Sequence, residues 1–175
     1  MSQEAPRHWR LNKQRYAMVG EICLSCEEVI FPPRDICPNC KQEARTPYVL
    51  NGKGQVVSWT IIDRDEAPEE FKVQAPYIVA QIQTDDGPVV TAQITDLDWK
   101  EERVVDAGGD WHWEKKFDVE MGMRVEMVTR KLKEDGEKGI LVYGYKFRRP
   151  IGANQEDNYP LVLENSLADS LAEAG

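Results

Sequence analysis

The stretch CLSCEEVIFPPRDICPNC, residues 23–40, contains all four cysteines of the chain as two Cys-x-x-Cys pairs. Each pair turns two thiolates toward one point, and two such pairs supply the four soft ligands that a tetrahedral zinc ion prefers. The spacing predicts a zinc ribbon, in which one structural zinc is bound by Cys23, Cys26, Cys37 and Cys40. A site closed by four thiolates leaves no position for a substrate, so we expect no catalytic metal. Iron in the same ligand pattern remains open as an alternative.

The residues around the cysteines predict a small module that the metal holds together. Residues 8–16 indicate a short N-terminal helix, and residues 16–22 and 28–31 indicate short strands on both sides of the first cysteine pair. A segment of this size rarely folds without a metal or another crosslink. We therefore assign residues 1–46 to an N-terminal helix and a rubredoxin-like zinc ribbon.

From residue 47 the pattern changes to strands rich in Val, Ile, Thr and aromatic residues, separated by Gly, Pro and Asp turns. The expected strands are residues 54–62, 77–82, 89–94, 123–132 and 139–147. Five strands with a long connection between the third and the fourth are typical of a small Greek-key barrel of the OB type. The predicted fold class is mainly β, with the barrel over residues 47–150.

Two segments fall outside the five strands. Residues 96–120 are charged, contain Trp99, Trp111 and Trp113, and form either an exposed hairpin insertion or a loop that covers one end of the barrel. Residues 151–175 contain five acidic and no basic side chains, and leucines 163, 167 and 171 recur at helical spacing. This tail is predicted to be a short acidic helix that serves assembly, or that docks on the chain's own barrel.

Composition and charge exclude several classes of protein. No apolar run approaches the roughly 20 residues that a membrane-spanning helix needs, so we expect a cytoplasmic protein without a membrane partner. The formal net charge is −9, whereas a protein that tracks a nucleic-acid backbone normally presents a basic surface. Because OB barrels also bind single strands, a nucleic-acid-binding module is kept as the alternative function.

Several short motifs together resemble a known family. The run from Gln14-Arg15-Tyr16 and Gly20 through both cysteine pairs contains Phe31-Pro32-Pro33-Arg34 between them, and Tyr143-Gly144-Tyr145-Lys146-Phe147 ends the last expected strand. Over about residues 7–149 the chain resembles the zinc-ribbon and OB-fold proteins that accompany thiolase-fold enzymes. A glycine usually follows the first cysteine pair in that family, and Glu27 stands there in this chain.

The resemblance implies a non-catalytic subunit that binds an acyl-CoA thioester in complex with a thiolase, a hydroxymethylglutaryl-CoA synthase or a thiolase-like aldolase. The cysteine and histidine content of the chain also favours a non-catalytic role. No cysteine remains once zinc is bound, and the two histidines, His8 and His112, lie in charged or aromatic surroundings without a nucleophile beside them in the sequence.

Lys146, Arg148 and Arg149 are the predicted contacts to a CoA phosphate. On a strand, residues 146 and 148 share one face about 7 Å apart, so their charges could hold one phosphate group. The alternative is that these basic side chains offset acidic neighbours while Tyr143, Tyr145 and Phe147 fill the barrel.

Overall fold

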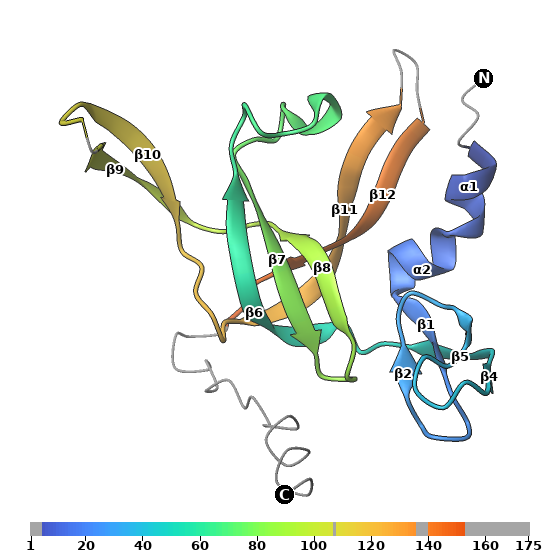
Figure 1. Cartoon of the computed structure of the whole chain (residues 1–175). Coiled ribbons are helices and arrows are strands. Elements are labelled where there is room, and N and C mark those ends of the chain that lie inside the picture. Colours follow the sequence, from blue (N-terminus) through green and yellow to red (C-terminus); the bar gives the residue numbers. More distant parts are fainter. Residues whose placement is uncertain (1–4, 107, 136–139, 153–175) are drawn as a thin grey trace, which may run out of the picture.

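The computed structural model describes residues 5–106, 108–135 and 140–152, and the fold is mainly β (Figure 1). Its N-terminal end contains two short helices, α1 (Ala5–Arg10) and α2 (Asn12–Ala17), joined at Leu11. The predicted helix over 8–16 is therefore present as two pieces. The strand expected to begin at Tyr16 was placed too early, because Tyr16 belongs to α2 and the strand begins at Val19.

The zinc-ribbon part is built from very short strands. β1 (Val19–Ile22) pairs with β2 (Val29–Ile30) on one side and with β5 (Thr46–Val49) on the other. β3 (Asp35–Ile36) and β4 (Glu43–Ala44) form a second, two-stranded hairpin. Each cysteine pair lies in the turn of one of these hairpins, which brings the two pairs to one place. The predicted ribbon is confirmed.

Five longer strands close into a barrel, as an OB fold requires. They are β6 (Lys53–Ile62), β7 (Tyr77–Thr84), β8 (Val89–Ile94), β11 (Arg124–Asp135) and β12 (Ile140–Arg148), in the spatial order β11-β12-β8-β7-β6 with β6 returning to β11. β12 and β8 pair in parallel, and the other contacts are antiparallel. The connection from β6 to β7 contains the short 3-10 helix η1 (Glu69–Phe71). The predicted five-stranded barrel is confirmed.

The barrel core also takes side chains from the N-terminal part. Phe147, Ile78 and Ile82 are almost fully buried inside it, each contributing about 1.5–3 kcal/mol through burial. Met18, whose backbone ends α2 in the left-handed conformation, belongs to the same cluster with 0% exposure, together with Leu50. The ring of Phe31 packs edge-on against Tyr145 at 5.7 Å between ring centroids. The N-terminal part therefore contributes side chains to the hydrophobic core of the barrel.

The segment predicted as a hairpin or a covering loop is a hairpin. β9 (Trp99–Val105) and β10 (Trp111–Phe117) pair along their whole length and project away from the barrel (Figure 1). At its tip the Asp106 carboxylate accepts hydrogen bonds from the backbone N–H groups of Gly108 and Asp110. At its base Phe117 packs against the barrel core. The predicted helical tail lies outside the described residues.

Within the ranges that the structure describes, none of the helices has the length and apolar character needed to cross a membrane.

Candidate metal centre and binding residues

The two cysteine pairs lie in turns of the same backbone geometry. The N–H of Cys23 donates to the carbonyl of Glu28 (2.9 Å), and the N–H of Cys37 donates to that of Gln42 (2.9 Å). The residues that follow the pairs, Glu27 and Lys41, both adopt left-handed backbone angles, with φ of 59° and 63°. This conformation favours glycine, which explains why a glycine is usual at the position of Glu27 and what its replacement costs, about 1 kcal/mol.

The sulfur atoms meet at one point and fit a tetrahedral zinc ion. All four Sγ atoms lie within 4.8 Å of one another, with 3.4 Å between Cys23 and Cys40 and 3.6 Å between Cys26 and Cys37. Zn–S bonds of about 2.3 Å in a tetrahedron place the sulfurs roughly 3.8 Å apart, close to these distances. Cys23 and Cys37 are fully buried against Ile30 and Ala44. The chain thus presents a rubredoxin-like zinc ribbon whose metal has a structural role.

Backbone amides prepare the first ligand for the metal. The pKa of the Cys23 thiol is lowered to about 6, above all by a hydrogen bond from the backbone of Ser25. The thiolate is the form that binds zinc, so a lowered thiol pKa reduces the cost of releasing its proton. The turn of the first pair therefore contributes to metal affinity through its backbone.

A buried carboxylate, which was not predicted from the sequence, fixes the backbone just before the second cysteine pair. Glu21 on β1 is 8% exposed and accepts the backbone N–H groups of Arg34 (2.8 Å) and Asp35 (2.9 Å). It fixes the chain just before Cys37. One signal could have indicated this role: Glu21 is an acidic residue within the short strand Val19–Ile22, and a buried charge needs partners.

Replacing Glu21 with alanine is expected to lower the free energy of unfolding by about 2–3 kcal/mol, because the backbone N–H groups of Arg34 and Asp35 both lose a charged acceptor. Chemical denaturation of the zinc-loaded protein measures this loss. As a control, Glu43→Ala removes an exposed carboxylate paired with Arg45 and should change stability by about 0.5 kcal/mol or less. Equal effects of both substitutions would contradict the role of Glu21.

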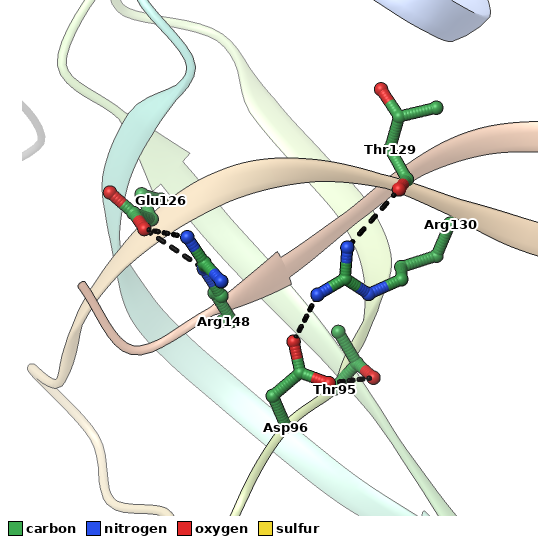
Figure 2. Close-up of polar contacts among 6 residues, drawn as sticks. All are labelled: Thr95, Asp96, Glu126, Thr129, Arg130 and Arg148. Carbon is green, nitrogen blue, oxygen red and sulfur yellow. Dashed lines mark hydrogen bonds and ion pairs between the residues drawn. The ribbon is translucent and has the colours of Figure 1, made fainter. Parts of the chain in front are cut away.

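The structure gives each of the predicted CoA contacts a partner within the chain. Arg148 pairs with Glu126 at 2.8 Å (Figure 2), and Arg149 pairs with Asp118 at 2.9 Å. Lys146 is 7% exposed and donates to Gln74 Oε1 at 2.9 Å. For the two arginines, this arrangement agrees with the alternative in which the basic side chains offset the charge of acidic neighbours. The assignment of all three to a CoA phosphate stays a prediction.

The hairpin places its aromatic residues on one face. Residues that pair directly across an antiparallel ladder share a face, and Val105 opposes Trp111 while Trp99 opposes Phe117. With the alternation along each strand, this face carries Trp99, Glu101, Arg103, Val105, Trp111, Trp113, Lys115 and Phe117, and we name it the aromatic face. The opposite face carries Lys100, Glu102, Val104, His112, Glu114 and Lys116.

The aromatic face is exposed and ordered by its own contacts. Trp99, Trp111 and Trp113 remain 48%, 55% and 62% exposed. The Arg103 guanidinium lies 4.7 Å from the centroid of Trp111, and the Lys115 ammonium lies 4.3 Å from that of Trp99. Since a tryptophan has an area of roughly 250 Å², about 400 Å² of aromatic surface faces solvent on this ribbon. The largest apolar patch of a typical monomer has an area of about 300–600 Å² and is often functional, which makes this face a candidate interaction site.

Comparison with protein families covers both halves of the fold. Residues 13–44 match the family described as the ChsH2 rubredoxin-like zinc ribbon domain, and residues 47–130 match the ChsH2 C-terminal OB-fold domain. Among solved structures, the "Ltp2-ChsH2(DUF35) aldolase" contains a chain that is 19% identical, with a TM-score of 0.52 over 85% of this chain and 95% of that one. This likeness shows the shared fold.

Curated relatives share more of the sequence. A "DUF35 domain-containing scaffold protein" of Methanocaldococcus jannaschii is 38% identical over 143 residues, which are 81% of this chain and 88% of that protein. A protein of the same name from Methanothermobacter thermautotrophicus is 38% identical over 149 residues, 85% of this chain and 98% of that protein. These matches confirm the family resemblance predicted from the cysteine pairs and the motifs around them. The chain belongs to the family of DUF35 domain-containing scaffold proteins, with a ChsH2-type zinc ribbon followed by a ChsH2-type OB-fold domain.

Proposed function

We propose that this protein is a non-catalytic scaffold subunit that docks onto a thiolase-family enzyme through the aromatic face of its β9–β10 hairpin. The observation that carries the proposal is that face, with three tryptophans about half exposed on a two-stranded ribbon. An isolated two-stranded hairpin is only marginally stable in water, and an uncovered aromatic face on it gains stability when another surface covers it.

The composition of the aromatic face indicates a protein partner. Tryptophan and arginine are the residues most enriched among the energetically dominant contacts of protein interfaces. Arg103 and Lys115 against Glu101 give the face a formal charge of +1, whereas the whole chain carries −9. A partner surface that is apolar with acidic groups at its rim would complement this face, and two copies of the chain would repel each other at long range.

The proposal includes an acyl-CoA thioester as the ligand of the complex. This ligand is what the family resemblance of the sequence motifs implies. The names of similar proteins, a scaffold protein and an "Ltp2-ChsH2(DUF35) aldolase", support the role of a subunit in an enzyme complex. The chemistry then belongs to the partner. In the described part of the chain all four cysteines converge on the metal centre, which leaves no thiol as a nucleophile.

The test is to isolate the tagged full chain from its native cells, to identify the enzymes that co-purify, and to assay the chain with and without them. We expect a thiolase-fold enzyme in the complex, and carbon–carbon bond formation or cleavage in acyl-CoA substrates only when that enzyme is present. Turnover by the single subunit at high purity, or a complex without a thiolase-fold protein, would refute the proposal.

A further inference from the structure

Lys146 on β12 is a buried lysine without an acidic partner at ion-pair distance among the residues that the structure describes. It is 7% exposed, and within residues 5–106, 108–135 and 140–152 its ammonium has one hydrogen-bond acceptor, Gln74 Oε1 at 2.9 Å. Lysine is almost never buried unless it is paired, and an ammonium has three N–H donors to satisfy. The ammonium therefore has N–H donors left for a further acceptor, and a negatively charged acceptor would offset the cost of its burial.

Gln74 is held so that it faces Lys146 with its carbonyl end. Its Nε2 donates to the backbone carbonyl of Leu132 at 2.7 Å, which leaves Oε1 directed at the ammonium. Gln74 lies in the connection between β6 and β7, just after η1, and Leu132 lies on β11. The β6–β7 connection, anchored on β11, thus holds the Lys146 side chain in place.

Lys146 and Gln74 line a cavity of about 270 Å³. Its polar lining comes from Lys146, Gln74, Gln93, Thr95 and Asp96, and Leu97 and Phe117 belong to its apolar lining. Small-molecule sites are concave and contain a few converging polar groups that orient the ligand. The volume suits a molecule of a few carbon atoms.

The charges around the cavity select the kind of anion. Asp96 pairs with Arg130 at 2.6 Å (Figure 2). The pKa of Lys146 is lowered, first by burial and then by the nearby Arg130, and Asp96 acts in the opposite direction. Lys146, Arg130 and Asp96 together carry a formal charge of +1. One carboxylate neutralises this charge, whereas a phosphate dianion would exceed it.

We infer that this cavity binds the carboxylate of a small organic acid, or of an acyl group that carries one, with Lys146 as its ion-pair partner. The hydrocarbon part of the ligand lies against Leu97 and Phe117. Since Arg148 and Arg149 have acidic partners of their own, the inferred site relies on Lys146 and Gln74. It stands independently of the docking of a partner on the hairpin.

The test is an NMR titration of the isotope-labelled, zinc-loaded full chain, which follows the side-chain amide of Gln74. The probes are butyrate, its uncharged analogue butyramide, inorganic phosphate and CoA. Butyrate should give saturable shifts, and butyramide, phosphate and CoA should bind at least tenfold more weakly. Equal binding of butyramide, stronger binding of phosphate or CoA, or no saturable binding by any probe would overturn the inference.

Two variants locate the site. Lys146→Met should weaken butyrate binding at least tenfold and leave the melting temperature equal or higher, since it removes a buried charge. Lys131→Met, which removes an exposed lysine of the adjacent strand that is paired with Glu134, should bind butyrate normally. Unchanged binding by Lys146→Met would overturn the assignment even if butyrate binds elsewhere.

A further pair of probes distinguishes the two sources of the carboxylate. Succinyl-CoA carries a free carboxylate on its acyl group, and acetyl-CoA does not. Tighter binding of succinyl-CoA than of free succinate would assign the cavity to an acyl group, and equal or weaker binding would assign it to a free acid. Both results support the carboxylate site, whereas equal binding of acetyl-CoA and succinyl-CoA would contradict it.

Discussion

A Cys37→Ser chain is expected to contain no stoichiometric zinc, to have an unfolded ribbon and to aggregate. Zinc binding contributes about 10–16 kcal/mol to the folding of small zinc modules, which matches or exceeds the typical total stability of about 5–15 kcal/mol of a domain. Cys37 is fully buried at the centre of the site, so the remaining three sulfurs cannot rearrange around it without exposing the ribbon core. Elemental analysis and thermal unfolding by circular dichroism measure both effects.

The matched control for Cys37→Ser is Ser25→Ala, in the first cysteine pair. The pKa effect on Cys23 comes from the backbone of Ser25, and the substitution keeps that backbone. The variant should bind one zinc per chain and melt close to the original protein. A Cys37→Ser protein with full zinc content and an unchanged melting temperature would show that the four-cysteine site does not organise the fold.

Replacing Trp111 and Trp113 together with serine is expected to weaken the complex with the partner enzyme by about 100-fold or more. Tryptophans at the centre of an interface each contribute about 2 kcal/mol or more when truncated. Because both side chains are more than half exposed in the isolated chain, its melting temperature should change by only a few degrees. Titration calorimetry with the co-purified enzyme measures the affinity.

The hairpin supplies its own control for this experiment. His112 and Glu114 alternate with the two tryptophans on the same strand and lie on the opposite face. His112→Ser with Glu114→Ser should leave the affinity within about threefold, since exposed polar side chains away from an interface contribute little. Similar losses from both double variants would mean that the hairpin acts through its backbone or its length instead of its aromatic face.

The sequence predicted those parts of the fold that depend on local pattern. The cysteine spacing indicated convergence on one metal, and the Val, Ile, Thr and aromatic content of residues 54–62 and 77–82, bounded by turns, was sufficient to predict barrel strands. The same pattern did not separate a hairpin from a covering loop over residues 96–120, because Gly108-Gly109 permits both. Tyr16 was predicted both as the end of the first helix and as the start of the next strand, and the structure places it in the helix that ends at Ala17.

The binding residues were harder to predict because their surroundings come from distant parts of the chain. Lys146 looked like an exposed strand residue, and its burial depends on Gln74, which lies 72 residues earlier in the connection after η1. In the same way, the stabilising role of Glu21 depends on a backbone N–H group that lies 13 residues later in the sequence. Neither periodicity nor composition reports such long-range contacts.

The position of Met18 restricts how this architecture can be cut, copied or exchanged. A fragment that begins at residue 47 would include all five barrel strands and lack the side chain that fills the end of their core. The resulting hole would cost about 2–5 kcal/mol, as large-to-small core changes do. If the barrel is joined to another metal module, in evolution or in the laboratory, the new module must supply a side chain in the place of Met18. Otherwise a substitution in the barrel core must compensate for its loss.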